Sequence, residues 1–468
     1  MLWIVAVLLL FIIQLAAVIV LEYKRSNKAV SWLVVLFVLP ILGFLPYYFL
    51  AREYACDRIF KGKDSRNLEQ TRLELVDRCN RRISAEAQEE MEDERMPAIL
   101  RTFSTAPAYC CETEVFDEGE RAFEAMLESI AAARHHVHVE FYIIRDDELG
   151  RRFERLLIRK AREGIKVRLI YDGIGSRKLG KDYVKRLRAA GVETGTFFPF
   201  SSAFMRKCLN YRNHRKIVVV DGRIGFFGGL NIGDEYLGKD PYFGYWRDTH
   251  FCIRGDAVLW LQYTFLTDWL LVKGQLPADA EYFPDQPSAG NQCIQIVKTG
   301  PDETILELVF SLIVSAKKRI YIETPYFIPD PGVLLALKTA VKRGVDVKVI
   351  IPSIPDKELV YFASLSYVRE MLEAGVRFFR YRKGFLHVKA IICDDLACSG
   401  TANMDMRSFS DQFEISAVFI DEKIVGRLVE QFKRDLGESE EIGPSEFEGR
   451  PKKQRMKEVF ARLLSPLF

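Results

Sequence analysis

The sequence predicts an α/β protein of two duplicated halves packed around one active site, preceded by two membrane-spanning helices. The first observation is an internal repeat. Residues 130–173 and 313–353 both run from a helix end through a strand, a turn and a second helix to a glycine, then enter another strand. These glycines are Gly164 and Gly344. Alternating strands and helices indicate a largely parallel or mixed sheet covered by helices in each half.

Two uncharged apolar runs at the front of the chain are the second observation. Residues 1–21 contain one polar residue, Gln14, and residues 29–51 carry no charge. Each run is long enough to cross a hydrocarbon core of about 30 Å. A cleaved signal peptide is the alternative for the first run, but that run lacks a basic leader and a clear small-residue cleavage site. We expect a transmembrane hairpin whose second helix is kinked by Pro40, Gly43 and Pro46.

The basic residues around this hairpin predict its orientation. The connection at residues 22–28 is too short to do more than reverse the chain, so the N-terminus and the large domain lie on the same side. Basic residues after the hairpin outnumber those in the turn, which favours a cytoplasmic catalytic domain. The turn carries Lys24, Arg25 and Lys28, and the following segment carries Arg52, Arg58, Lys61, Lys63 and Arg66.

Changes in composition predict the domain boundaries. The tail combines a basic run with an apolar helical stripe, and it either binds anionic lipid headgroups or packs on the domain. The segments are a hairpin (1–51), a juxtamembrane linking segment (52–115), a first half (116–270), a connection (271–300), a second half (301–440) and a basic amphipathic tail (441–468).

Composition excludes several classes of protein. The net charge of +3 is too small to indicate a nucleic-acid partner. Nine cysteines without a CxxC pair argue against a disulfide framework and a thiolate metal site. The adjacent Cys110 and Cys111 are read as reduced structural thiols, with a redox pair as the alternative. The oligomeric state stays open, and a homo-oligomer is compatible with the sequence.

Two strings in the repeat carry the chemistry. NHRKIVVVDG contains His214, Lys216 and Asp221, and LHVKAIICDD repeats the same spacing with His387, Lys389 and Asp394. Side chains alternate along a strand, so each histidine shares a face with its lysine. Each aspartate has the opposite parity and is expected to be structural, pinning the turn that follows its strand.

A third histidine-rich string suggests a metal site only at first sight. HHVHVE places His136, His138 and Glu140 on one strand face, which suits a metal by ligand type. The corresponding residues of the second half are Arg319, Tyr321 and Glu323, so the glutamate alone occurs in both copies. We therefore expect no metal and no other cofactor, and we expect both glutamates to support the floor of a shared cleft.

The paired His-x-Lys-(x)4-Asp strings resemble those of the phospholipase D superfamily. The strings GGLNIGDEYLG, YWRDTHF, ETPYFIPD, FLHVKAIICDD and GTANMDMRSF are similar to bacterial cardiolipin synthases, and the resemblance covers nearly the whole chain. Two departures are visible. The second copy is one residue shorter between Asp394 and Gly400, and Gly229 stands where Thr401 supplies a hydroxyl. The second departure puts in doubt a hydroxyl contact to phosphate from the first half.

The chemistry needs cations, a nucleophile and an acid, because a phosphodiester is negatively charged and repels nucleophiles. Lys216 and Lys389 would hold the phosphoryl oxygens, while one imidazole attacks phosphorus and the other protonates the leaving oxygen. The resemblance implies that His214 is the nucleophile and His387 the acid and then base. It also implies that acidic residues after the motifs orient the imidazoles, namely Asp248 and Glu414, and that Asn231, Asn403 and Thr401 help to bind substrate.

Three functional classes compete. The resemblance implies a bacterial membrane enzyme that joins two phosphatidylglycerol molecules into cardiolipin and glycerol through a phosphohistidine. Related phosphodiesterases and transferases are the alternative, including a nuclease, a hydrolytic phospholipase D, and synthases that use phosphatidylethanolamine or CDP-diacylglycerol. A catalytically silent lipid-binding scaffold is the third. The hairpin disfavours a nuclease, and two intact His-Lys pairs disfavour the scaffold.

Overall fold

The computed structural model describes residues 2–23, 26–50, 63–82, 98–199, 210–277, 280–300, 305–410 and 412–467. Several sequence-based expectations fall on other residues. The turn cations Lys24 and Arg25, the basic residues at 52, 58 and 61, and part of the expected linking segment, residues 83–97, lie outside the described part. The side chains of Lys63 and Cys110 are also not described.

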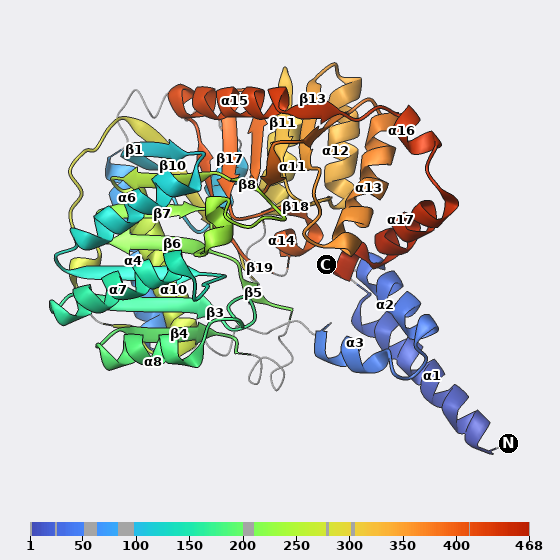
Figure 1. The fold of residues 1–468 in the computed structure, drawn as a ribbon, viewed down its shortest axis with the longest axis horizontal. Helices are drawn as coiled ribbons and strands as arrows, with labels where there is room; N and C mark the ends of the chain where they lie inside the picture. Colours follow the sequence, from blue (N-terminus) through green and yellow to red (C-terminus); the bar gives the residue numbers. More distant parts are fainter. Residues whose placement is uncertain are drawn as a thin grey trace.

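A 15-stranded sheet runs through both halves, and seven strands follow the same order in each half when read outward from the centre, with β21 added at the edge of the second (Figure 1). The halves meet where β1 and β10 pair antiparallel. The first half reads β1 (Ala108–Phe116), β9 (His250–Arg254), β7 (Ile224–Gly228), β6 (Lys216–Val220), β2 (His136–Phe141), β3 (Lys166–Asp172) and β4 (Glu193–Phe197). The second reads β10 (Gln292–Lys298), β20 (Ile415–Phe419), β17 (Leu396–Gly400), β16 (Ala390–Cys393), β11 (Arg319–Glu323), β13 (Asp346–Pro352), β14 (Arg377–Tyr381) and β21 (Ser439–Glu441).

Each half begins one strand earlier than the sequence predicted. β1 lies almost wholly within the expected linking segment, and β10 lies within the expected connection. Neither strand is joined to its neighbour in the sheet by a strand–helix–strand unit, which was the pattern that marked the halves. Their antiparallel pairing merges the two halves into one sheet instead of leaving a linker between them.

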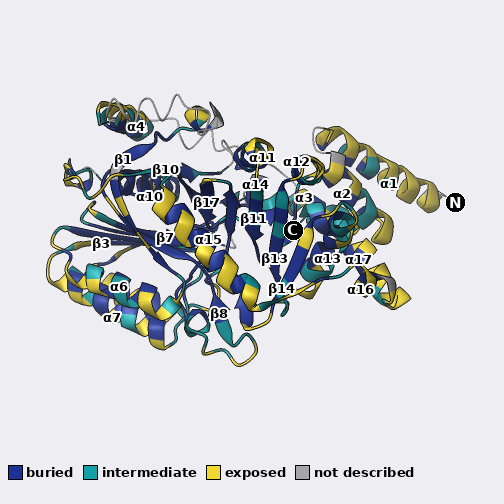
Figure 2. Ribbon diagram, turned by 90° about the horizontal axis from the view of Figure 1, so that it is seen from above, coloured by how far each residue is buried: buried dark blue, intermediate teal, exposed yellow. Residues whose placement is uncertain are grey.

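Helices cover both faces of this sheet, and the alternation along β6 shows how. Ile217 and Val219 belong to the core cluster under α10 (Ala257–Lys273). Val218 and Val220 belong to the cluster under α6 (Gly119–Ala131) and α7 (Glu148–Arg162). The predicted strand parity is therefore confirmed, and Figure 2 shows the buried sheet between its helical layers.

The remaining helices follow the repeat. After α7 and after α12, Gly164 and Gly344 have φ angles of 87° and 85°, a left-handed conformation that glycine adopts without strain. This confirms the predicted helix ends. α4 (Lys63–Arg81) lies on α10, and α8 (Lys181–Ala189) precedes β4; the second half carries α11 (Leu306–Ser315), α12 (Pro331–Lys342), α13 (Glu358–Glu373) and α15 (Glu422–Gly437).

The two motif aspartates are structural, but they do not pin the turn expected. Both adopt left-handed backbone conformations, with φ of 54° at Asp221 and 52° at Asp394. Asp221 accepts hydrogen bonds from the backbone N–H groups of residues 134–136 at 2.8 to 2.9 Å. Asp394 accepts from those of residues 317–319 at 2.6 to 2.9 Å. Each carboxylate thus fixes the loop that enters the neighbouring central strand, far away in sequence.

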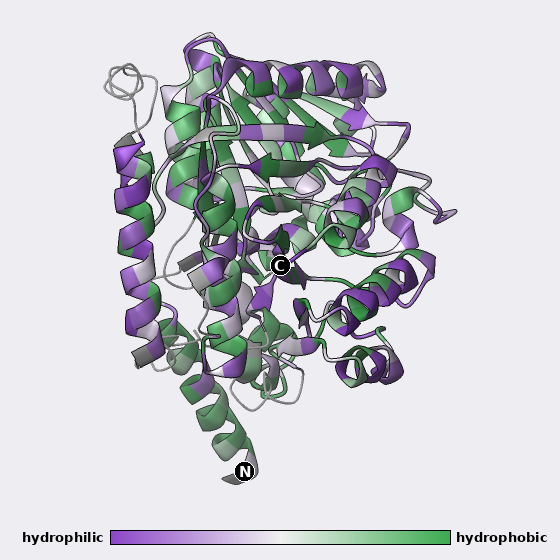
Figure 3. Ribbon diagram, turned by 90° about the vertical axis from the view of Figure 1, so that its left-hand side faces the viewer, coloured by the Kyte–Doolittle hydropathy of each residue, from purple (hydrophilic) through white to green (hydrophobic). Residues whose placement is uncertain are grey.

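The front of the chain differs from the expected hairpin of two long helices. Among the described residues, one helix is long and apolar enough to cross a membrane, the segment Trp3–Leu21 of α1 (Leu2–Leu21) (Figure 3). The second apolar run forms α2 (Ser26–Val38) and α3 (Phe44–Leu50). Pro40 cannot continue the helical hydrogen bonds, and Ile41 takes a left-handed φ of 68°. The predicted kink is therefore a complete break.

The C-terminal tail packs on the domain. α16 (Ser445–Glu448) leads into α17 (Lys452–Leu464), which ends in the short helix η5 (Ser465–Leu467). The Ser31 hydroxyl of α2 donates to the Leu463 carbonyl at 2.6 Å. The Tyr367 and Ser465 hydroxyls lie 3.0 Å apart. The tail thus connects the N-terminal helices with α13. Of the two alternatives for the tail, its buried face therefore packs on the domain.

Candidate active site

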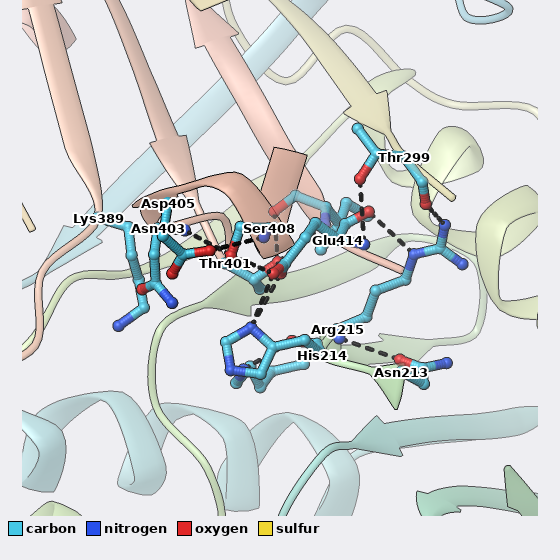
Figure 4. Close-up of polar contacts among 12 residues, drawn as sticks. Asn213, His214, Arg215, Thr299, Lys389, Thr401, Asn403, Asp405, Ser408 and Glu414 are labelled. Atoms are coloured by element: carbon cyan, nitrogen blue, oxygen red, sulfur yellow. Dashed lines mark hydrogen bonds and ion pairs between the residues drawn. The ribbon is translucent and has the colours of Figure 1, made fainter. Parts of the chain in front are cut away.

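The first motif histidine lies where a strand of its own half meets a strand of the other. β5 (Arg212–Asn213) pairs in parallel with β19 (Gln412–Phe413), and the His214 amide donates to the Phe413 carbonyl at 2.9 Å. This brings the imidazole to Glu414, whose carboxylate oxygens lie 2.9 and 3.1 Å from Nδ1 (Figure 4). A carboxylate of the second half therefore orients the histidine of the first.

The second histidine has the same arrangement with the two halves exchanged. β15 (Gly384–Leu386) pairs in parallel with β8 (Tyr245–Arg247) of the first half. The His387 amide donates to the Arg247 carbonyl at 2.7 Å, and its Nδ1 lies 2.7 Å from Asp248 Oδ2. The acid of each half therefore serves the histidine of the other half. Since Nδ1 is engaged in both imidazoles, Nε2 is the nitrogen available for chemistry.

The two lysines lie next to their histidines and are buried. Lys216 Nζ donates to the His214 carbonyl at 2.6 Å, and Lys389 Nζ donates to that of His387. Burial lowers the pKa of Lys216 to about 7 and that of Lys389 to about 8, against the attraction of the site carboxylates. An anionic phosphoryl group between them would favour the charged form of both lysines.

The electrostatics of each motif includes a contribution from the other half. Burial lowers the pKa of His214 to about 4, and Lys389 of the other half contributes to the shift. Burial lowers the pKa of His387 to about 3, with a contribution from Lys216. Both imidazoles are therefore neutral at pH 7 before substrate arrives, which suits a nucleophile. An imidazole that acts as the acid must first take up a proton, which the negative charge of the substrate favours by raising its pKa.

Gly229 and Thr401 occupy corresponding positions but treat their carboxylates differently. Thr401 is fully buried, and its hydroxyl donates to Glu414 Oε2 at 2.5 Å. The same hydroxyl also lies 3.1 Å from the Ile415 carbonyl. Thr401 therefore contacts the orienting carboxylate, and its contact with phosphate stays a prediction. At Gly229 a Cβ atom would lie 1.9 Å from Asp248 Oδ1. The glycine makes room for the aspartate.

The two predicted asparagines also differ. Asn231 Oδ1 accepts from the Ile143 amide at 3.0 Å, and its Nδ2 donates to the Tyr236 hydroxyl at 3.2 Å. Asn403 lies beside Lys389 (Figure 4), and its Oδ1 is buried without a hydrogen-bond partner. Substrate binding stays a prediction for both asparagines.

Two buried charge clusters support the site, and sequence reasoning recognised one member of each. Glu140 accepts from Asn213, and burial with the neighbouring Asp268 raises the pKa of Glu140 well above its usual range. Arg215, inside the first motif, pairs with Asp268 and donates to the Glu414 carbonyl at 3.0 Å. An arginine between the motif histidine and lysine was the signal that could have revealed this cluster.

The equivalent cluster of the second half contains Glu323. Burial and Asp435 raise the pKa of Glu323 well above its usual range, and Arg247 Nε lies 2.7 Å from Asp435 Oδ2. Arg247 immediately precedes Asp248, and its backbone carbonyl accepts the hydrogen bond from the His387 amide. The cluster therefore stabilises the strand that leads to the orienting carboxylate. Both glutamates are buried, and their role as the floor of a shared cleft stays a prediction.

The HHVHVE histidines belong to the packed interior. His136 Nε2 lies 3.2 Å from Gln262 Oε1 on α10, and His138 Nδ1 lies 2.8 Å from Nε2 of the same glutamine. His138 also stacks on Phe265, with ring centroids 4.4 Å apart. Hydrogen bonds to α10 and ring packing account for both side chains.

Comparisons with known proteins agree with this geometry. A family profile described as cardiolipin synthase, PLD-like domain, matches residues 126–240 and 309–436, which are the two halves around the motifs. In solved structures, the fold is similar to phosphatidylserine synthase of Haemophilus influenzae, with a TM-score of 0.59 at 15% identity over 76% of this chain and 95% of that one. That likeness supports the fold of both halves.

Curated relatives extend the similarity to almost the full chain. Cardiolipin synthase 2 of Bacillus anthracis is 44% identical over 97% of this chain and 89% of its own length. Major cardiolipin synthase ClsA of Bacillus subtilis is 40% identical over 98% of both. The shared halves, the crossed histidine–carboxylate pairs and this extended identity show that the chain belongs to the cardiolipin synthase family with a phospholipase D-like domain.

Proposed function

We propose that this chain is a membrane phosphatidyltransferase that makes cardiolipin and glycerol from two phosphatidylglycerol molecules. The observation that carries the proposal is the crossed pairing of His214 with Glu414 and of His387 with Asp248 in one buried site. Two oriented imidazoles and two lysines supply the nucleophile, the acid and the cations that phosphodiester exchange needs. Family membership supplies the lipid class.

The first displacement uses both imidazoles. Nε2 of His214 attacks phosphorus, a P–N bond forms, and the P–O bond to glycerol breaks. His387, protonated on Nε2 in the complex, gives its proton to the departing glycerol oxygen. The phosphodiester charge supports that protonation, because an anion nearby raises a histidine pKa that burial has lowered. The phosphatidyl group is then held on His214 as a phosphoramidate.

The second displacement runs in reverse with a new alcohol. Neutral His387 takes the proton from a terminal glycerol hydroxyl of the second phosphatidylglycerol, and that oxygen attacks phosphorus. The new P–O bond forms as the P–N bond breaks, which returns His214 to its neutral form. Lys216 and Lys389, with Asn403 and Asn231, are proposed to hold the phosphoryl oxygens throughout.

The chain is associated with a membrane, as its bacterial relatives and its apolar N-terminal helix indicate. We further propose that the second apolar run also enters the bilayer and that both halves lie on the cytoplasmic side. α2 has 13 residues and spans only about 20 Å, so this run would cross the bilayer as a broken segment with α3. The excess of basic residues after the hairpin supports the orientation.

Labelled phosphatidylglycerol in vesicles, with no added nucleotide, tests the reaction. We expect cardiolipin and free glycerol in equal amounts, and excess glycerol should drive the reaction backward because one phosphodiester replaces another. Phosphatidic acid as the main product would establish a hydrolase instead. Cardiolipin formation only after addition of phosphatidylethanolamine or CDP-diacylglycerol would assign another donor.

A further inference from the structure

A cleft of about 670 Å³ lies outside the histidine site, where the N-terminal helices meet the second half. Its walls come from α2, α12, α13 and α17, which converge near the C-terminus in Figure 1. Met406 also lines it, and this residue begins α14 (Met406–Ser410). The Ser408 hydroxyl of the same short helix donates to Glu414 at 3.0 Å. One helical turn therefore separates the cleft from the active site.

One wall of the cleft is cationic and partly hydrated. Lys338 Nζ lies 2.6 Å from Glu370 Oε1, and Arg462 binds the other oxygen of the same carboxylate. The side chains of these three residues are 31 to 38% exposed, so the cations are accessible to a ligand. Across all the lining residues, four cations face two carboxylates; the cations are Lys338, Arg369, Arg455 and Arg462, and the acids are Glu370 and Glu458.

The other wall is apolar and exposed. Val30 of α2, Leu335 of α12 and Val459 of α17 line the cleft with 49%, 66% and 61% of their surface exposed. The hydrogen bond from Ser31 to Leu463 holds α17 against α2, so these side chains lie beside the apolar N-terminal helices. A cation cluster bordered by apolar side chains at the membrane end of a protein matches a phospholipid, whose headgroup is anionic and whose chains are not.

We propose that this cleft binds one anionic glycerophospholipid, with its phosphate at Lys338 and Arg462 and its acyl chains along Val30, Leu335 and Val459. The site is separate from the two histidines and does not depend on the transfer chemistry. Phosphatidylglycerol and cardiolipin share the required chemistry, whereas phosphatidylcholine carries a cation that these residues would repel. Occupancy would fix α2 and α17 against α12 and α13, next to the helix that supports Glu414.

Lipid binding to full-length His214→Ala protein tests the proposal without turnover. The protein in detergent micelles is titrated with phosphatidylglycerol, cardiolipin or phosphatidylcholine, and bound lipid is counted by native mass spectrometry. We expect one tightly bound anionic lipid in this cleft, in addition to any lipid at the histidine site, and about tenfold weaker binding of phosphatidylcholine. Tighter binding of phosphatidylglycerol or of cardiolipin supports the site and identifies its occupant. Equal binding of phosphatidylcholine would overturn it.

Substitutions of opposite sign separate lipid binding from a structural role. In the same background, Lys338→Gln should weaken the binding of the anionic lipid about tenfold, whereas Glu370→Gln should strengthen it a few-fold by removing a repelling charge. Lys342→Gln, on the same helix but outside the cleft, is the matched control and should change nothing. If Lys338→Gln and Glu370→Gln weaken binding alike, or if Lys338→Gln matches the control, the site is not a lipid site.

Discussion

The two halves of the molecule share a backbone but surround their histidines differently. His214 lies near Tyr142, and its partner Glu414 also accepts hydroxyl donors from Thr401 and Ser408. His387 packs against Trp246 and Phe385, with ring centroids 5.1 and 5.8 Å apart. Its partner Asp248 has a glycine at the position of Thr401.

The duplicated scaffold gives both histidines the same backbone geometry, and the proposed mechanism assigns their different roles to the side chains around them. The hydroxyl donors around Glu414 stabilise a fixed, ionised carboxylate, which suits a histidine that acquires a covalent bond and a positive charge. Among the described residues, Asp248 has no hydroxyl donor in its hydrogen bonds, which leaves His387 as its side-chain partner, and the proposed mechanism has this histidine hold and release a proton.

Neutralising each orienting carboxylate should produce the largest loss. Glu414→Gln and Asp248→Asn should each lower the overall rate about a thousandfold or more, because an amide no longer holds the reactive tautomer. A nitrophenyl phosphodiester donor distinguishes the steps, since its leaving group needs no proton. Asp248→Asn should keep a burst of nitrophenol, and Glu414→Gln should lose it.

Asp182→Asn, an exposed acid on α8, controls for loss of one negative charge. A burst that survives in Glu414→Gln and disappears in Asp248→Asn would exchange the roles of the two sides.

Substitutions at the corresponding positions 229 and 401 should have unequal effects. In Gly229→Ala the added Cβ collides with the Asp248 carboxylate, so we expect about a hundredfold loss of transfer activity through misplacement of His387. Thr401→Val keeps the shape but removes one donor to Glu414, and a loss of about tenfold or less is expected. The transfer rate of each variant is measured at a temperature well below its melting point, so that unfolding does not contribute. Equal losses of activity in the two variants would contradict the asymmetry.

The repeat predicted much of what these variants probe. The spacing of histidine, lysine and aspartate, together with Gly164 and Gly344, predicted two α/β halves and the face that carries the chemistry. Asp248 and Glu414 could be named as orienting acids, and the contacts place each against an imidazole. Which acid meets which histidine could not be predicted, because the pairing depends on short strands that cross between halves.

Other differences have local causes. β1 and β10 fall in segments predicted as linkers, because each pairs antiparallel at the centre of the sheet and no strand–helix–strand unit joins it to a sheet neighbour. The run at 29–51 has the composition of a single span, but a left-handed Ile41 after Pro40 divides it. Thr401 was placed on phosphate by its position in the motif, and its partner Glu414 became evident only from the contact.

Removing each motif lysine should stabilise the protein, and more so in the first half. Folding lowers the Lys216 pKa from 10.5 to about 7, so the folded state disfavours its ammonium at neutral pH. Lys216→Met should therefore raise the free energy of unfolding at pH 7 by on the order of a few kcal/mol, and Lys389→Met by less. The gain should shrink as the pH rises from about 7 toward 10.5, where the unfolded lysine also loses its charge.

Thermal melts in detergent at pH 7 and pH 9.5 measure these shifts, with Lys342→Met as the exposed control. A lower melting temperature for Lys216→Met at pH 7 would show that the ammonium stabilises the resting site.

Trapping the phosphatidyl group tests most directly the claim that the halves share one site with divided roles. His387→Ala protein, given a nitrophenyl phosphodiester lipid, should attack but then lack the base that activates the second alcohol. We expect a phosphoramidate, stable in base and labile in acid, which peptide mass mapping places on His214, and we expect none in His214→Ala. An adduct on His387 in His214→Ala protein, with none on His214 in the reverse variant, would contradict this assignment, and no adduct in either would contradict the covalent mechanism.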